Sequence, residues 1–206
     1  NGPGGEVSRM CMDKVDTDSA VDTLGIKGVH VIPGKVVNLK ELEILSSGDL
    51  GLFWKNLRKE LKSRTLVVKP RADGCSSGIV RLWSADDLKK YIKLLKDRAV
   101  SIKENSFKGQ TSIIEMPVEP IEDLLFQKFI ETDVVRIKGN KLKHYRQSGL
   151  IEVTVAVVEE EGKLRVFSPS ITVAEGEVLT VEEKFQGGTG VNITPPPISI
   201  VSRKAL

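Results

Sequence analysis

The stretch that most constrains the fold is residues 65–83, where two strand-like runs flank a loop of small residues. The runs are TLVVKP at 65–70 and IVRLW at 79–83, and both are rich in the apolar and β-branched residues that strands prefer. A strand, not a helix, follows the loop. We therefore predict that residues 71–78 form the tip of an antiparallel hairpin.

This loop, RADGCSSG, is preceded by Lys69. Its small side chains would let backbone N–H groups and serine hydroxyls approach an anion closely, and Lys69 would direct a cation at the same ligand. The common phosphate-binding loop has its lysine after the glycines and a helix behind it, so this would be a site of another design. An ordinary mobile turn with a surface lysine is the more frequent outcome for such a loop taken alone.

Helical patterns recur along the chain. The clearest is residues 84–99, where Ser84 and Asp87 match a capping box and the apolar residues form one stripe. Residues 13–24 and 46–63 are also predicted to be helices. In the basic part of the latter helix, the charges indicate either a solvated face or the rim of an anionic-ligand site.

Short apolar runs predict further strands at 29–33, 112–116 and 124–130, and a hairpin formed by 150–160 and 163–173. Residues 134–149 carry little signal, and we expect a long insertion or loop there. The tail at 182–200 is rich in Gly, Thr and Pro and is not expected to be regular through its prolines. Hairpins mixed with helices indicate an α+β fold, not a doubly wound parallel sheet.

Composition excludes several classes of function. The chain has 31 basic and 28 acidic residues, so its charge of +3 gives no support to nucleic-acid binding. No apolar run is long enough for a membrane span. Cys11 and Cys75 have neither zinc-site nor disulfide spacing, which indicates reduced thiols in an intracellular compartment. Cys75 is expected to be a small loop residue, with a reactive thiol as the alternative.

Two later stretches add to the interest of the glycine loop. EEKFQGGTG at 182–190 again places charged residues before glycines. Glu152 lies in the run LIEVTVAV, where alternation would put it on the face of Thr154 and opposite Val153. A carboxylate at such a place caps a polar ligand or, alternatively, faces solvent.

In their order along the chain, five stretches resemble motifs of the D-alanine–D-alanine ligase family of ATP-grasp enzymes, and the resemblance runs nearly end to end. It implies an ATP-grasp fold, in which two α+β subdomains with antiparallel sheets enclose a nucleotide cleft, present here incompletely. The first subdomain would be 1–120 and the start of the second 121–206. The five stretches are MCMDK (10–14), VVKPRADGCSSGIV (67–80), LFQKFI (125–130), IEVTVAV (151–157) and EEKFQGGTG with the prolines after it.

The resemblance implies a role for each matching residue. Lysines at three positions would reach the nucleotide phosphates, a loop would close over them, a hinge would hold adenine and a carboxylate would accept the ribose hydroxyls. These are Lys14, Lys69 and Lys184; Gly74, Cys75 and Ser76; Gln127, Lys128, Phe129 and Ile130; and Glu152. Of these, Lys69, Ser76 and Lys184 would be catalytic.

Departures from the family pattern are also present. Cys75 stands where the family has a serine, Gln127 where it has a glutamate, and Phe185 where it has a tyrosine. A glutamine oxygen could still accept a hydrogen bond from the adenine amino group. The insertion and the tail resemble plant homologues, which suggests the plastid stroma or the cytoplasm for the full-length protein.

The activity that the resemblance implies is ATP-dependent joining of two D-alanine molecules through an acyl phosphate, with lysines and Mg²⁺ neutralising the phosphoryl oxygens. The Mg²⁺ ligands and an N-terminal domain are expected outside this chain, which we predict to be a fragment that is inactive alone. One alternative is a non-catalytic ATP-grasp module that binds nucleotide or a partner protein. Another is a ligase for a different carboxylate substrate.

Overall fold

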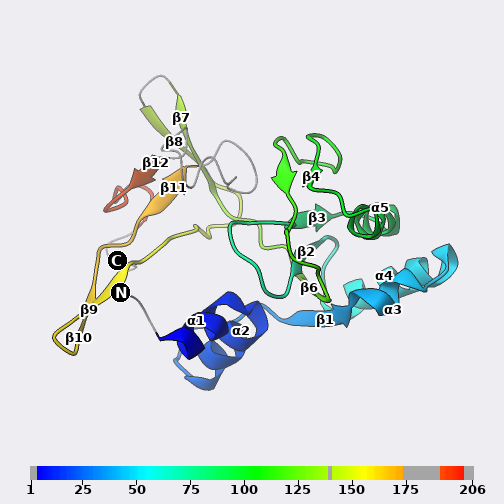
Figure 1. The fold of residues 1–206 in the computed structure, drawn as a ribbon. Coiled ribbons are helices and arrows are strands. Elements are labelled where there is room, and N and C mark those ends of the chain that lie inside the picture. Colours follow the sequence, from blue (N-terminus) through cyan, green and yellow to red (C-terminus); the bar gives the residue numbers. More distant parts are fainter. Residues whose placement is uncertain (1–3, 139–140, 174–190, 202–206) are drawn as a thin grey trace. The chain divides into compact units, whose positions relative to one another are not determined.

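The computed structural model describes residues 4–138, 141–173 and 191–201. The chain divides into two compact units, Asn1–Phe129 and Ile130–Leu206, whose helices and strands are labelled in Figure 1. None of the described helices is long and apolar enough to cross a membrane.

A four-stranded antiparallel sheet forms the centre of the first unit, with the strand order β1-β6-β2-β3. β6 comes last in the sequence yet lies between β1 and β2, so the sheet joins segments far apart in the chain. The two short strands β4 and β5 pair with each other beside it. The bounds are β1 Gly34–Asn38, β2 Leu66–Pro70, β3 Val80–Leu82, β4 Ser101–Ile102, β5 Ile114–Glu115 and β6 Asp123–Lys128.

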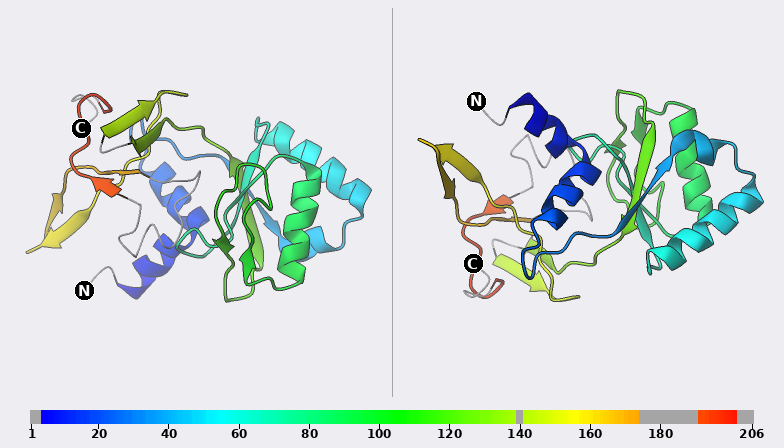
Figure 2. Two further views of the ribbon diagram at one scale, coloured as in Figure 1. Left: turned by 90° about the horizontal axis from the view of Figure 1, so that it is seen from above. Right: turned by 90° about the horizontal axis from the view of Figure 1, so that it is seen from below.

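Helices lie on both sides of this sheet (Figure 2). One side carries α3, α4 and α5, and the other carries α1 and α2. Apolar side chains from α3–α5 and from alternate sheet residues form the core, and the burial of each large one stabilises the fold by roughly 1.5–3 kcal/mol. The helices are α1 Gly5–Met12, α2 Lys14–Thr23, α3 Leu39–Glu43, α4 Ser47–Glu60 and α5 Ala85–Lys96.

The alternation of strand residues separates the two faces of the sheet. Leu66 and Val68 of β2 are fully buried in the core, so Val67 and Lys69, which alternate with them along the strand, lie on the opposite face. Residues directly opposite each other in an antiparallel pair share a face. Leu125 of β6 lies opposite Lys69 and is therefore on that same face, away from the core.

Capping side chains fix where the helices begin. Ser84 caps α5, and it forms the predicted capping box with Asp87. Ser46 caps α4 by accepting from the backbone N–H of Asp49. Asp13 ends α1 and caps α2, which breaks the segment into two helices.

The first unit confirms most of the predicted elements. The helices predicted at 13–24, 46–63 and 84–99 are present as α2, α4 and α5, and the hairpin around the glycine loop is present as β2 and β3. The strand predicted at 29–33 is wrong, because the strand that pairs with β6 begins after the proline, at Gly34. Predicted strands at 112–116 and 124–130 correspond to β5 and β6. Helices α1 and α3 were not predicted.

In the second unit, the described residues form three antiparallel strand pairs and a small apolar cluster of Val135, Ile171, Val173 and Val201. The prediction of a loop or insertion at 134–149 is wrong, since β7 and β8 form a hairpin there. Of the predicted second hairpin, only β9 and β10 pair as expected. The bounds are β7 Val134–Lys138, β8 Lys141–Tyr145, β9 Val157–Glu160, β10 Lys163–Val166, β11 Ile171–Val173 and β12 Val191–Ile193.

The predicted boundary between two subdomains lay at 120/121, whereas β6, at 123–128, pairs within the sheet of the first unit. β12 lies in the tail and ends before Pro195, so the prolines themselves are outside regular structure. The assignment of the two parts to ATP-grasp subdomains stays a prediction.

Candidate functional site

The glycine loop is anchored at its base, where it returns toward β3. The backbone N–H of Gly78 donates to the Glu115 carbonyl at 2.8 Å, and the Tyr91 hydroxyl donates to the Gly78 carbonyl at 2.7 Å. Gly78 has φ +64°, and a Cβ atom there would lie 3.1 Å from the Pro70 ring. A glycine is needed at this position, because both the backbone angle and the space disfavour a side chain.

The tip of the loop is a folded turn with an unusual backbone. Cys75 and Ser76 have positive φ angles of 55° and 60°, a conformation that residues other than glycine adopt infrequently. The N–H of Ser77 donates to the Gly74 carbonyl at 3.0 Å, and that of Gly74 donates to the Asp73 carboxylate at 2.6 Å. Such strained backbone occurs disproportionately at ligand-binding loops.

Lys14 and Lys69, from α2 and β2, are brought together beside this loop. The Lys14 ammonium donates to the Asp73 carbonyl at 2.8 Å. Burial lowers the pKa of Lys14 below its usual value, and the nearby charge of Lys69 lowers it further. Burial likewise lowers the pKa of Lys69, against the opposing effect of Asp18. Two partly buried cations therefore lie close enough for the charge of Lys69 to disfavour the charged form of Lys14.

Gln127 lies on the same face of the sheet as Lys69, with only 4% of its surface exposed. Its amide nitrogen donates to the Asp18 carboxylate and to the Ile32 carbonyl, both at 2.9 Å. A glutamate here would repel Asp18 and would leave that carbonyl without a donor. These two contacts explain why a glutamine suits this position better than the glutamate expected from the family pattern. The amide oxygen of Gln127 can accept a hydrogen bond from a ligand.

The side chains of the next two predicted hinge residues, Lys128 and Phe129, lie in different surroundings. Lys128 is exposed and, by strand alternation, points to the face opposite Gln127. Its backbone, not its ammonium group, is therefore placed for a ligand on the Lys69 face. The Phe129 ring lies 3.7 Å from the guanidinium carbon of Arg81, which also lies 4.2 Å from the centre of the Trp83 ring.

Of the predicted site residues that the structure describes, two belong to the second unit. Ile130 is half-buried and Glu152 is exposed. The predicted strand around Glu152 is wrong, since the only described pairing nearby is a single bridge between Thr154 and Ser170. Neither face is buried there, so the register of a strand is weakly specified. The predicted Lys184, with Phe185, lies outside the described residues.

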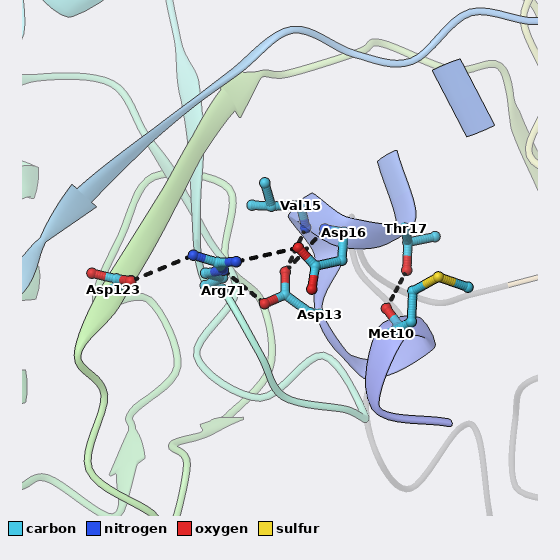
Figure 3. Close-up of polar contacts among 7 residues, drawn as sticks. All are labelled: Met10, Asp13, Val15, Asp16, Thr17, Arg71 and Asp123. Carbon is cyan, nitrogen blue, oxygen red and sulfur yellow. Dashed lines mark hydrogen bonds and ion pairs between the residues drawn. The ribbon is translucent and has the colours of Figure 1, made fainter. Parts of the chain in front are cut away.

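Sequence reasoning missed Arg71 and its carboxylate partners. Arg71 forms ion pairs with Asp13 at 2.7 Å, with Asp16 at 3.3 Å and with Asp123 at 3.8 Å (Figure 3). The sequence contained one signal for the ion pair of Arg71 with Asp13, because an acidic residue stands next to one predicted lysine and an arginine stands close to the other. Asp13 directly precedes Lys14, and Arg71 follows Lys69 by two positions.

The part of the chain that the structure describes contains no candidate metal site. No group of three or more His, Cys, Asp or Glu side chains is placed there to hold a metal ion. The carboxylates around Arg71 are instead occupied by its guanidinium group.

Comparison with known proteins gives similarity at the level of structure. No model of a known protein family matches the chain, and no curated protein sequence does. Among solved structures, D-alanyl-alanine synthetase A from Vibrio cholerae is similar, with a TM-score of 0.57 and 13% identity over 100% of this chain. The chain spans 46% of the length of that protein.

Two further structures show weaker similarity. The D-alanine–D-alanine ligase from Coxiella burnetii has a TM-score of 0.44 and 14% identity, covering 79% of this chain and 33% of its own. The VanG D-Ala:D-Ser ligase from Enterococcus faecalis has a TM-score of 0.49 and 16% identity, covering 92% of this chain and 40% of its own. The predicted fold is confirmed: the chain has the α+β ATP-grasp fold of the D-alanine–D-alanine ligase structures.

Proposed function

We propose that this chain provides the ATP-binding part of a carboxylate–amine ligase that joins two D-alanine molecules. The observation that carries the proposal is the pair of partly buried lysines, Lys14 and Lys69, beside the glycine loop. The ATP-grasp fold shared with a D-alanyl-alanine synthetase supports the same reading. The lysines match the positions that the family resemblance assigns to the nucleotide phosphates.

Electrostatics explain why such a pair favours a polyphosphate ligand. Removing an ammonium group from water disfavours its charged form, and a second cation nearby disfavours it again. An anion with several negative oxygens reverses both effects, since each lysine then gains charge-assisted hydrogen bonds. The loop at 73–78 would close over the same phosphates with its backbone N–H groups.

In the proposed reaction, the carboxylate of the first D-alanine attacks the terminal phosphorus of ATP, giving an acyl phosphate and ADP. The amine of the second D-alanine then attacks the acyl carbon, the C–N bond forms, and inorganic phosphate leaves. Lys14 and Lys69 would orient the phosphates and neutralise negative charge as it shifts. Lys184 would add a third cation.

Mg²⁺ is the metal that the resemblance implies for this chemistry. Among the residues that the structure describes, no group of three or more His, Cys, Asp or Glu side chains is placed to hold this ion.

The binding part of the proposal is tested by titrating ATP into the chain and measuring the heat. Replacing Lys14 or Lys69 by Ala is expected to weaken ATP binding about tenfold or more, since a hydrogen bond to a charged group contributes roughly 1.5–3 kcal/mol. Lys55→Ala is the matched control, because Lys55 is an exposed lysine of α4, on the other face of the sheet. Equal affinities in all three variants would refute the proposed site.

The ligase part is tested by measuring phosphate release from ATP in the presence of D-alanine, L-alanine or no amino acid. Release that depends on D-alanine, with D-alanyl-D-alanine as product, is the expected result. Dependence on L-alanine instead would exclude the proposed substrate.

A second candidate is a non-catalytic nucleotide-binding module. The observation that favours it is Gln127, whose amide is already bound to Asp18 and Ile32, a departure from the glutamate expected of the ligases. Such a module would bind ATP as tightly as a ligase but release no phosphate with any amino acid, which separates the two candidates.

A further inference from the structure

Arg71 lies at the end of β2 among carboxylates from two other elements (Figure 3). Its Nε donates to Asp13 Oδ2 at 2.7 Å, one terminal nitrogen donates to Asp16 at 3.3 Å, and the other lies 3.8 Å from Asp123. Asp13 and Asp16 stand at the start of α2, whereas Asp123 begins β6. A single side chain therefore joins three elements that are remote in sequence.

The surroundings of Arg71 show why such a junction is needed. Lys14 and Lys69 belong to α2 and β2, and the positive charge of Lys69 acts unfavourably on Lys14, whereas the nearby carboxylates of Asp73 and Asp13 act favourably on it. The Lys14 ammonium also donates to the Asp73 carbonyl. Arg71 fixes the position of the Asp13 carboxylate, which is one of the two that favour the charged form of Lys14.

Backbone contacts lie at the same junction. The N–H of Lys14 donates to the Arg71 carbonyl at 3.0 Å, and Asp13 forms an antiparallel bridge with Ala72. The N–H of Arg71 donates to the Asp123 carbonyl at 3.0 Å. The backbone thus sets the register between α2 and β2, and the Arg71–Asp13 ion pair supplies an attraction one residue away from Lys14.

We propose that Arg71 is a positioning residue: through its ion pair with Asp13, it holds the ammonium of Lys14 beside that of Lys69, ready for the phosphates of a nucleotide. This inference rests on the proposed nucleotide-binding function. Arg71 does not itself bind the phosphates, because all three of its nitrogens are directed at carboxylates. Lysine cannot replace it, since an ammonium group lacks the planar fork that reaches several carboxylates at once.

If Arg71 positions Lys14, its loss should weaken binding only of ligands that carry phosphates. A merely structural role would weaken the binding of all ligands alike. Titrations would use ATP, ADP, AMP and adenosine as probes, followed by calorimetry. Arg71→Ala and Arg71→Lys are expected to weaken ATP binding about tenfold, a typical effect for coupled residues in contact. The loss should shrink from ATP to AMP and vanish for adenosine, because Lys14 meets only the phosphates.

A second test compares the loss of ATP affinity in the double variant with the losses in the two single variants. If Arg71 acts through Lys14, then the double variant Arg71→Ala with Lys14→Ala binds ATP no more weakly than Lys14→Ala alone. Asp13→Asn provides an independent route, because its amide oxygen still caps α2 while the charge that pairs with Arg71 is lost. Asp22→Asn is the control, an exposed aspartate of the same helix.

The outcomes distinguish this inference from the function on which it rests. No ATP binding by the unaltered chain would refute the proposed function. ATP binding that is unchanged in Arg71→Ala, or losses that add in the double variant, would overturn the positioning role while leaving the function intact. If Arg71→Ala does not fold, as judged by circular dichroism, the same cycle is run with Asp13→Asn and Lys14→Ala, and additive losses there overturn it equally.

Discussion

The hydroxyl of Tyr91 donates a 2.7 Å hydrogen bond to the carbonyl of Gly78, which ties helix α5 to the base of the glycine loop. Tyr91 is fully buried, and burial raises the pKa of its hydroxyl above the usual value, so the group remains a neutral donor. The packing of the helix and the position of the loop are therefore joined by one polar contact in the core. A change of one atom in the core is expected to be felt at the loop.

Tyr91→Phe keeps the aromatic ring but leaves the Gly78 carbonyl without this donor. We expect a loss of about 1–3 kcal/mol in the free energy of unfolding, the usual cost of a buried acceptor left unsatisfied. Urea unfolding followed by circular dichroism measures it. A variant as stable as the unaltered chain would show that water or another donor satisfies the carbonyl.

Lys69→Met removes a partly buried charge while keeping an unbranched side chain. Because burial lowers the pKa of Lys69, the folded state disfavours the charged form at neutral pH, and the variant is expected to be more stable by roughly 0.5–2 kcal/mol. The same variant should bind ATP more weakly. Thermal unfolding and calorimetry check the two effects, and a destabilised variant would contradict the first.

ATP binding should be accompanied by proton uptake. The pKa values of Lys14 and Lys69 are lowered in the unliganded protein, and bound phosphate oxygens would raise them again. ATP affinity is accordingly expected to fall as pH rises through the lowered pKa values. Calorimetry in two buffers with different ionisation enthalpies counts the protons, and proton release on binding would contradict the expected sign.

Asp133 stabilises the second unit through its carboxylate, which accepts from the N–H groups of Gln147, Ser148 and Gly149, each within 2.9 Å. These bonds, with a contribution from His144, hold the pKa of Asp133 well below its usual range, against the effect of burial. A group with a lowered folded-state pKa stabilises the fold above its unfolded pKa of about 3.9, and the effect is lost as pH falls through the folded value.

Asp133→Asn should therefore destabilise the chain at pH 7, and the difference from the unaltered protein should shrink at strongly acidic pH. Unfolding curves recorded from pH 7 down to about pH 2 would measure this. Glu159→Gln, which changes an exposed carboxylate of the same unit, serves as the control. A difference that stays constant across this range would argue against the carboxylate charge as its origin.

Local signals explain which elements could be predicted. Helix α5 was recognisable because Ser84 and Asp87 form a capping box and the apolar stripe fits a helix. The first strand was misplaced because residues 29–33, VHVIP, form a more apolar run than the strand that follows them, GKVVN at 34–38. Only pairing with β6 decides between them, and it needs Gly34, where a Cβ would lie 2.7 Å from the Leu125 side chain.

Long-range contacts explain what was missed. The hairpin of β7 and β8 is charged and weakly patterned, and Asp133 holds the turn that follows it from outside the hairpin. In the candidate site, Lys69 was recognisable from its position before the glycine loop, and Lys14 was identified through the family resemblance. Arg71 was not, because its role depends on carboxylates that come from α2 and β6 and are brought to it only by the fold.

The central position of β6 also has a consequence for how the chain is made. β1 has no partner strand other than β6 in the described sheet, so during synthesis it waits unpaired until residues 123–128 have left the ribosome. The β2–β3 hairpin and α5 can assemble earlier, because their contacts are local. A shortened gene product that stops before Asp123 would lack β6 and leave the edges of β1 and β2 exposed, and such edges promote aggregation.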